Sequence, residues 1–311
     1  MSDFLWVEKY RPKTISETIL PSSLKAVFGK MVETGELPNM LFSGTAGTGK
    51  TTVAKALCNE LELDYIIVNG SEEGNIETLR GKIKQFASSV SLQGGYKVVI
   101  LDEADYLNPQ STQPALRGFI EEFSNNCRFI LTCNFKNRII EPLHSRCSVY
   151  EFNTTKKDMA ELAGMFFKRF TSILDDEGVV YEQKAAADLI MKHAPDWRRV
   201  LNEGQRQGIS GLDITSNTIS TGVDTFATLA SYLKAKDFKK MRAWVVNHMD
   251  IDTVAIYRGL YNNMNELVDA SSIPQLVLIL ADYQYKDSFV ADHELNTVAC
   301  MTEIMAGVQF K

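Results

Sequence analysis

The 311-residue sequence has no paired cysteines. Its five cysteines are scattered, and no two of them form a C-x-x-C pair; they are Cys58, Cys127, Cys133, Cys147 and Cys300. This odd number and this spacing argue against the common zinc motifs and against a disulfide framework. Unpaired cysteines are typical of a reducing compartment, so we expect an intracellular, cytoplasmic protein.

Long hydrophobic runs are also missing. No stretch approaches the roughly 20 apolar residues that a membrane-spanning helix needs. The opening residues, MSDFLWVEKYRPK, do not place a basic stretch before an apolar one, as a secretory signal does. We therefore expect no membrane partner.

The chain has no excess of positive charge. Its formal net charge is −6 and its isoelectric point is about 5.4. These values argue against a protein coated in basic residues, but affinity for nucleic acid depends on local phosphate contacts rather than on total charge. Any DNA-binding surface must therefore be a restricted patch.

The first part of the sequence alternates between apolar, β-prone runs and helical patterns. Apolar, β-prone runs cover residues 39–43, 64–69, 96–101, 127–132 and 147–152. Helical patterns between them cover residues 51–61, 76–90 and 114–123. The runs are nearly continuous in hydrophobicity, as strands buried on both faces are. The alternation predicts an α/β domain with a parallel sheet over residues 1–153.

After residue 153 the strand signal fades. Helical patterns at 156–174, 183–193 and 196–206 predict a small helical domain over residues 154–212. Residues 213–223 are rich in turn formers, and we interpret them as a linker. Residues 224–311 again show helical periodicity, which predicts a third, all-helical domain.

A phosphate-binding signature follows the first predicted strand. Residues Gly44, Thr45, Ala46, Gly47, Thr48, Gly49, Lys50 and Thr51 fit G-x-x-x-x-G-K-[ST] and open a predicted helix that continues with Thr52. The glycines let successive amides point at phosphate oxygens, and the helix start adds partial positive charge. We expect Lys50 to reach the β- and γ-phosphates of ATP and Thr51 to coordinate Mg²⁺. The alternative is a chance glycine-rich turn.

Two carboxylates end the predicted strand at 96–101. Asp102 and Glu103 would lie at the carboxyl edge of the sheet, where α/β ligand sites occur. We expect Asp102 to hold Mg²⁺ and Glu103 to polarise an attacking water. The alternative is a pair of solvated acids at a strand end. Asp105 is either part of this site or only a helix-start residue.

Several blocks together resemble the AAA+ clamp-loader ATPases. In order, they are Trp6-Val-Glu-Lys-Tyr-Arg-Pro12, Asp102-Glu-Ala-Asp105, Gln113-x-Ala-Leu-Arg117, Cys133-Asn134, Ile140-Glu-Pro-Leu143, Ser145-Arg-Cys147 and Asp196-Trp-Arg198-Arg199. They span about the first two-thirds of the chain. Spacing and length are most similar to the large subunits of the T-even-type bacteriophage branch, which would place the protein in the host cytoplasm. The resemblance implies an ATPase domain, a helical lid and a helical collar that mediates oligomerisation.

The resemblance also implies roles in the nucleotide site. Asn134 matches the residue that senses the γ-phosphate and positions water, and Arg198 matches an arginine that reaches from the lid to the nucleotide of its own chain. Tyr10, Arg11 and Pro12 match the lining of the adenine pocket. On the residues alone, Asn134 could be a turn former, Arg198 a solvated helix residue, and residues 10–12 an exposed aromatic turn.

Arg146 resembles the family's arginine finger, which acts in trans on ATP held by the adjacent subunit. Such an arginine stabilises the charge that develops on the transferred phosphoryl group. The match therefore implies that one chain alone has an incomplete site. Without the match, Arg146 would be interpreted as a solvated arginine before an edge strand.

A DNA contact is expected from the helix predicted at 76–90. Arg80 and Lys84 are four residues apart and share one flank of its apolar stripe, whereas Lys82 lies on the other flank. The resemblance implies that Arg80 and Lys84 track the backbone of primer-template DNA, a contact that does not read sequence. The alternative is an ordinary solvated flank.

The resemblance implies an ATP-hydrolysing subunit of a hetero-oligomeric clamp loader, built as a pentameric spiral with other loader subunits. ATP binding would open and hold a sliding clamp, and primer-template DNA would trigger hydrolysis and clamp release during DNA replication. One departure is Gly118, where the family often has a second arginine, so the relay through Gln113 and Arg117 is expected to differ in detail.

Two other functions are compatible with the ATPase motifs. A helicase or remodeller of the same superfamily would carry them too, but such proteins usually lack the Trp6–Pro12 box together with Ser-Arg-Cys. A structural loader subunit would bind ATP without cleaving it, which the intact Lys50, Thr51, Asp102 and Glu103 argue against.

Overall fold

The computed structural model describes residues 4–89, 91, 94–215, 228–248 and 253–311. The chain divides into two compact units, Met1–Ser216 and Asn217–Lys311. Val90, the last residue of the helix expected at 76–90, and residues 216–223 of the expected linker lie outside the described residues.

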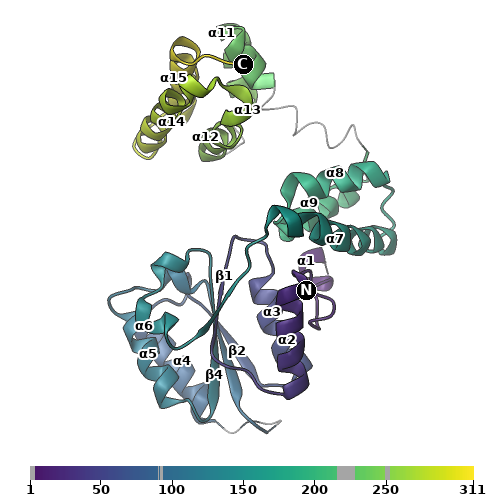
Figure 1. The fold of residues 1–311 in the computed structure, drawn as a ribbon, viewed down its shortest axis with the longest axis vertical. Helices are drawn as coiled ribbons and strands as arrows, with labels where there is room; N and C mark the ends of the chain where they lie inside the picture. Colours follow the sequence, from purple (N-terminus) through teal and green to yellow (C-terminus); the bar gives the residue numbers. More distant parts are fainter. Residues whose placement is uncertain (1–3, 90, 92–93, 216–227, 249–252) are drawn as a thin grey trace. The chain divides into compact units, whose positions relative to one another are not determined.

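A five-stranded parallel sheet forms the centre of the first unit (Figure 1). Its strands are β1 Met40–Ser43, β2 Tyr65–Asn69, β3 Lys97–Asp102, β4 Cys127–Cys133 and β5 Ser148–Glu151. They lie in the order β2-β3-β4-β1-β5, and every neighbouring pair is parallel. The predicted α/β fold with a parallel sheet is therefore confirmed.

Helices cover both faces of this sheet (Figure 1). One face carries α2 Ser22–Thr34 and α3 Lys50–Glu60, and the other carries α4 Ile76–Ser88, α5 Thr112–Glu122 and α6 Glu141–His144. Successive strand side chains point to opposite faces. Ile130 accordingly lies in the core under α2 and α3, whereas Leu131 lies in the core under α4 and α5.

Three longer helices follow the sheet within the same unit. They are α7 Lys156–Asp176, α8 Gln183–His193 and α9 Trp197–Ile209. Side chains cap two of them: Thr155 accepts from the amide of Asp158, and Asp196 accepts from the amide of Arg199. All three helices were predicted from periodicity.

Ile214 belongs to this helical region, although the sequence analysis placed it in the linker. Its side chain is fully buried. Its amide donates to the carbonyl of Val180 and its carbonyl accepts from the amide of Glu182, both at 2.9 Å. The turn-forming residues around Ile214 concealed an apolar side chain that the helical region needs to complete its core.

The sequence analysis identified a motif in the N-terminal segment and assigned no secondary structure to it. The segment contains the short helix α1 Trp6–Lys9, which packs on α9. Trp6 packs against two glycines of α9 that lie one turn apart: a Cβ at Gly204 would lie a tight 3.3 Å from the indole ring, and one at Gly208 would lie 3.6 Å from it, an ordinary contact distance. Two short 3-10 helices, η1 Ala104–Tyr106 and η2 Lys136–Arg138, were also not predicted.

Helices build the second unit, as predicted. They include α11 Phe238–Asn247, α12 Thr253–Asn262, α13 Met264–Leu267, η3 Ala270–Ser272, α14 Ile273–Asp287 and α15 His293–Gly307. Their apolar faces enclose a core that contains Trp244, Tyr257 and Cys300. No helix among the described residues of either unit is long and apolar enough to cross a membrane.

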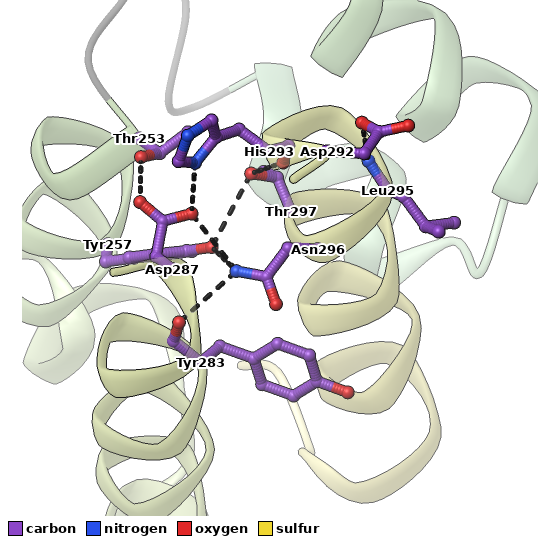
Figure 2. Close-up of polar contacts among 9 residues, drawn as sticks. All are labelled: Thr253, Tyr257, Tyr283, Asp287, Asp292, His293, Leu295, Asn296 and Thr297. Atoms are coloured by element: carbon purple, nitrogen blue, oxygen red, sulfur yellow. Dashed lines mark hydrogen bonds and ion pairs between the residues drawn. The ribbon is translucent and has the colours of Figure 1, made fainter. Parts of the chain in front are cut away.

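A buried polar cluster joins three helices of the second unit (Figure 2). The carboxylate of Asp287, at the end of α14, accepts from the Thr253 hydroxyl at 2.5 Å and from the Asn296 amide at 3.1 Å, and it lies 3.1 Å from His293 Nδ1. The Asn296 amide also donates to the Tyr257 hydroxyl at 3.1 Å. The cluster ties α14 to the starts of α12 and α15.

Candidate active site

A cleft opens at the carboxyl ends of the strands in the first unit. It encloses about 1040 Å³ of space, part of it open to solvent, which suits a small-molecule ligand. Sheet-edge residues and the helical region line it together: Val7, Tyr10, Arg11, Pro12, Thr18, Ile19, Leu20, Ala46, Gly47, Thr48, Gly49, Lys50, Thr51, Thr52, Val53, Asp102, Glu103, Thr132, Cys133, Asn134, Phe166, Arg169, Trp197, Arg198 and Leu201.

The phosphate loop connects β1 to the start of α3. Gly47 and Gly49 have φ values of 76° and 93°, in the left-handed region that glycine adopts without a side-chain penalty. The Thr48 hydroxyl donates to the carbonyl of Thr45 at 2.9 Å and tightens the turn. The loop therefore presents the amino end of α3 to the cleft, an arrangement that binds anions.

Lys50 is buried at the first position of α3. Its Nζ donates to the carbonyls of Gly44 at 2.7 Å and Thr45 at 2.8 Å, and to Asn134 Oδ1 at 2.9 Å. Burial lowers its pKa, an effect that neighbouring acidic groups partly oppose. The lysine thus connects the phosphate loop to the end of β4, at the place where a phosphate chain would lie.

The carboxylate of Asp102, at the end of β3, holds two hydroxyls. Its Oδ1 accepts from Thr51 at 2.7 Å and from Thr132 at 2.5 Å. Carboxylate and hydroxyl oxygens are ligands that Mg²⁺ prefers. The described residues contain no group of three or more acidic, histidine or cysteine side chains that could hold a metal alone. Asp102 and Thr51 therefore fit a magnesium ion that takes its other ligands from phosphate and water.

Glu103 has an unusual backbone. Its φ and ψ are 55° and 44°, the left-handed region that side-chain-bearing residues rarely adopt, and its amide donates to the Thr132 hydroxyl at 3.1 Å. Gly70 makes room for this turn, because a Cβ there would lie 2.5 Å from the Glu103 carbonyl oxygen. Strain of this type is typical of functional sites. The turn aims the half-buried Glu103 side chain at the cleft.

Asp105 fixes the backbone that carries Asn134. Its buried carboxylate accepts from the amides of Asn134 at 3.2 Å and Phe135 at 3.1 Å through Oδ2. Its Oδ1 is buried and has no hydrogen-bond partner among the described residues. Asp105 therefore has a feature of each alternative. It lies in the first turn of η1, and it also anchors the backbone of a cleft residue.

The N-terminal segment contributes the opposite wall of the cleft. The guanidinium of Arg11 donates to the Thr52 hydroxyl at 3.1 Å and pairs with Glu8. The Tyr10 hydroxyl donates to the Glu177 carboxylate of α7 at 2.8 Å. Tyr10, Arg11 and Pro12 therefore line the cleft and are not a free aromatic turn.

The start of α9 closes the cleft above the phosphate loop. A Cβ at Gly47 would lie 1.9 Å from the carboxylate of Asp196, so the two segments touch. Arg198 is the second residue of this helix, lines the cleft and is exposed. The structure thus places Arg198 in the same cleft as Lys50 and Glu103, and its contact with a nucleotide stays a prediction.

Comparison with known proteins agrees with this geometry. The sequence model of the ATPase family associated with various cellular activities (AAA) matches residues 40–154. The sliding-clamp-loader large subunit of Escherichia phage RB69 is 39% identical over 310 residues, 98% of this chain and 96% of that one. The chain belongs to the clamp-loader family of AAA ATPases. The corresponding subunit of Enterobacteria phage T4 is 33% identical over the same shares of the two chains.

This clamp-loader chain is also similar to more distant proteins. The replication factor C small subunit of Archaeoglobus fulgidus is 38% identical over 221 residues, 69% of this chain and 67% of that one. Among solved structures, Thermotoga maritima RuvB has a TM-score of 0.55 at 20% identity and covers 72% of this chain and 79% of its own. That likeness shows the fold alone. The resemblance to clamp loaders and their phage branch is confirmed.

Arg146 lies away from the cleft of its own chain. It lies two residues before the start of β5, whose first residue pairs with Met40 and whose last pairs with Ser43. The four residues of β5 rise about 3.3 Å each, so they separate Arg146 from the phosphate loop by more than roughly 10 Å. Its guanidinium instead bonds Glu121 of α5 at 2.5 and 2.9 Å and the carbonyl of Pro142 at 2.9 Å.

The two expected DNA contacts lie on the exposed flank of α4. Arg80 and Lys84 are both exposed, and neither has an ion-pair partner within the described part of the chain. Lys82, on the other flank, pairs with Glu73 at 2.8 Å. Both basic side chains are therefore accessible to a ligand, but they do not line the nucleotide cleft.

The helix α5 contains the expected relay residues. Gln113 is fully buried: its amide nitrogen donates to the carbonyls of Leu107 at 2.9 Å and Arg138 at 3.0 Å, and its oxygen accepts from the Ile140 amide at 2.9 Å. Gly118 is exposed, and a Cβ there would meet nothing within 4 Å. The packing of α5 in this chain therefore does not require glycine at position 118.

Sequence reasoning missed several cleft residues. Thr132 was hidden because its role depends on β4 lying next to β3, which spacing along the chain does not reveal. Phe166 and Trp197 stack at 4.7 Å between their ring centres, and Arg169 lies on α7. Only the clustering of aromatic and basic residues in Phe166-Phe-Lys-Arg169 hinted at these contacts.

Proposed function

We propose that this chain is the ATP-hydrolysing subunit of a sliding-clamp loader. The relatives named as sliding-clamp-loader large subunits span nearly its full length. A cleft with a phosphate loop, a threonine-bound aspartate and an adjacent glutamate supports hydrolysis over binding alone. The partners would be other loader subunits in a pentameric spiral, a sliding clamp and primer-template DNA, in the cytoplasm of the cell, which is the host cell if the protein is phage-encoded.

Each cleft residue has a proposed role with ATP and Mg²⁺. The amides of the phosphate loop and Lys50 hold the phosphates, and Thr51 and Asp102 bind the metal. A bound Mg²⁺ supplies positive charge that stabilises the oxygens of the transferred group. Glu103 orients the attacking water, and Asn134 holds it against the γ-phosphate. Tyr10, Arg11 and Pro12 take the nucleoside, and Arg198 reaches the phosphates from α9.

The position of Arg146 is the main support for an active site that two subunits share. An arginine at the amino end of β5 is too far from the carboxyl-end cleft to serve its own nucleotide. The exposed fraction of its side chain is 30%, so the guanidinium can exchange its surface partner Glu121 for a neighbour's phosphate. Arg146 therefore acts in trans, on ATP bound by the adjacent subunit.

The proposed cycle links this shared site to DNA. ATP binding draws the subunits into a spiral that holds the clamp open. Primer-template DNA then contacts Arg80 and Lys84 of each chain through its backbone, and the subunits align Arg146 with the neighbour's Glu103 and Asn134. Hydrolysis separates the interface and releases the clamp on DNA.

A mixing experiment tests the shared site. Arg146→Ala should bind ATP normally but lose about three to five orders of magnitude in clamp- and DNA-stimulated turnover, as other proteins do without the finger. Lys50→Ala should lose ATP binding. Complexes that contain both variants should recover part of the activity, because some interfaces pair an intact Arg146 with an intact Lys50. Full turnover by Arg146→Ala alone would show that the finger assignment is wrong.

The clamp-loader function is tested separately. Adding the cognate clamp and primed DNA to the assembled complex should raise ATP turnover well above the basal rate. A general DNA motor of the same fold would respond to DNA but not to the clamp. Turnover that is indifferent to the clamp would therefore exclude the loader assignment while leaving ATP hydrolysis in place.

A further inference from the structure

The cleft has a phosphate end and a second, less polar end. The phosphate end is defined by the amino terminus of α3, which favours anions. The lining outside the phosphate loop includes the apolar side chains of Val7, Pro12, Leu20 and Phe166, and we take these residues as the second end. If the cleft binds a nucleoside triphosphate, as proposed above, the nucleoside must occupy this second end. The residues that set its width then control how well the nucleoside fits.

One arginine of α7 spans this second end. Arg169 is half-buried and lines the cleft. Its Nη2 donates to the carbonyl of Tyr10 at 2.8 Å, and its Nη1 donates to the carbonyl of Glu17 at a longer 3.4 Å. The Tyr10 carbonyl belongs to the cleft-lining stretch at residues 10–12. The Glu17 carbonyl belongs to the end of the loop that connects this stretch to the second lining stretch, at residues 18–20. A single guanidinium therefore holds both ends of that loop.

The other bonds of this loop come from different elements. The amide of Ile15 donates to the carboxylate of Glu60, at the end of α3, at 2.7 Å. Lys25 of α2 donates to the carbonyls of Ser16 at 2.5 Å and Thr18 at 3.2 Å. The loop is thus fixed to the sheet side by α2 and α3. Arg169 bonds the same loop to α7. It therefore sets the distance between this loop and the α7 side of the cleft.

An arginine suits this position for a geometric reason. Its planar guanidinium carries five donors in a fixed arrangement, so it can bond two carbonyls at once, whereas a lysine ammonium acts as a single point of charge. Burial lowers the pKa of Arg169 and the nearby Glu17 carboxylate raises it, so this acid compensates part of the cost of placing a cation there.

We infer that Arg169 is a positioning residue for the nucleoside end of the cleft. It does not act on the phosphates. It holds the carbonyls of Tyr10 and Glu17 so that the two lining stretches stand at the separation that admits the nucleoside. Arg169 should therefore affect binding of a complete nucleotide, but not of a phosphate chain that lacks the nucleoside.

Two ligands separate this role from a general loss of structure. Arg169→Ala should weaken ATP binding by about tenfold, measured by titration calorimetry with Mg²⁺ on the full chain. Binding of magnesium tripolyphosphate, which engages only the phosphate end, should be unchanged. In the assembled complex KM for ATP should rise about tenfold at unaltered kcat. Lys168→Ala is the matched control, because Lys168 is the exposed neighbour on the same helix and should leave both affinities unchanged.

A conservative variant keeps the test decisive if Arg169→Ala does not fold. Arg169→Lys retains the charge but loses the two-point contact, so it should weaken ATP binding by about threefold and spare tripolyphosphate. Equal weakening of both ligands, or no weakening of ATP in a folded variant, would overturn the inference. Failure of the unmodified chain to bind ATP or tripolyphosphate would instead overturn the proposed nucleotide site.

Discussion

Each unit of the chain has an aspartate that accepts a threonine hydroxyl; it is half-buried in the first unit and buried in the second. In the first unit Asp102 accepts from Thr51 at 2.7 Å, and in the second Asp287 accepts from Thr253 at 2.5 Å. Both aspartates stand at the end of a regular element, and both collect further donors from neighbouring segments. As lists of polar side chains, the two clusters are hard to tell apart.

The difference lies in what surrounds the two carboxylates. Asp102 faces a cleft at the sheet edge, next to the amino end of α3, so its cluster can exchange partners with a ligand. The side chain of Asp287 is 8% exposed, and its partners Thr253, His293 and Asn296 approach it from two helices, α12 and α15. A hydrogen-bonded carboxylate is thus available to a ligand where open space and the amino end of a helix accompany it. Elsewhere it fixes how helices meet.

The strongest test of this comparison is Glu103→Gln in the cleft. Loss of the carboxylate that polarises water should lower ATP turnover by about 10²–10⁴-fold, the usual contribution of a positioned general base. ATP binding should remain, because Lys50 and Thr51 are intact. Steady-state turnover and calorimetry on the same complex measure both effects. Glu72→Gln, at an exposed position, is the control; unchanged turnover in Glu103→Gln would remove Glu103 from catalysis.

The second test removes the carboxylate of the other cluster. Asp287→Ala leaves Thr253, His293 and Asn296 without their shared acceptor, so the second unit should lose about 3 kcal/mol of stability. Amide exchange of α12, α14 and α15 in the full chain should accelerate, and ATP affinity should not change. Asp282→Ala, which removes an exposed pair with Lys286, should cost well under 1 kcal/mol. Equal effects of the two variants would contradict a structural role for the cluster.

A smaller effect is expected where a cleft acid acts only through the backbone. Asp105→Asn should lower turnover by about tenfold, equivalent to about 1.4 kcal/mol, because the amides of Asn134 and Phe135 lose a charged acceptor. ATP affinity should change little, since Asp105 does not face the phosphates. Asp188→Asn on the exposed side of α8 is the control. A loss of affinity as large as the loss of turnover would mean that Asp105 supports the whole cleft.

The smallest expected effect is a pH dependence of the second unit. Burial raises the pKa of Asp287, but the hydrogen bonds from Thr253, His293 and Asn296 outweigh it, so the net pKa is lowered below 3.8. A lowered folded-state pKa stabilises the protein above the unfolded value and loses this contribution as pH falls through the folded one. Amide exchange between pH 5 and 2.5 should therefore show a steeper loss of stability in the native chain than in Asp287→Asn. Parallel curves would contradict this.

Most of the sheet could be predicted from the sequence because it leaves a local signal. Strands buried on both faces, such as Val98-Val-Ile-Leu101, are continuous hydrophobic runs that the chain order alone reveals. The phosphate loop and the acids after β3 were predicted for the same reason, and the structure brings Lys50, Asp102 and Glu103 into one cleft. Their individual roles in catalysis stay predictions.

Other parts of the site depend on contacts between distant segments. Thr132 reaches Asp102 only because β4 pairs with β3, and Arg169 reaches the carbonyl of Tyr10 across 159 positions of sequence. Trp6 packs closely against Gly204 and Gly208 of α9, about 200 positions away in the sequence. No period or spacing in one segment encodes the partner in another, so these contacts were visible only in the folded chain.

The strand β5 separates Arg146 from the cleft of the same chain. Arg146 precedes it, and the cleft lies beyond its far end, so the shared site proposed above would join two different surfaces of successive subunits. Such a head-to-tail contact closes only if the rotation between subunits completes a ring. In an open series, the last cleft has no arginine from a neighbour and the first arginine has no cleft to serve. Counting the nucleotides hydrolysed in one synchronous round, against the number of subunits bound, would therefore reveal whether the assembly is open or closed.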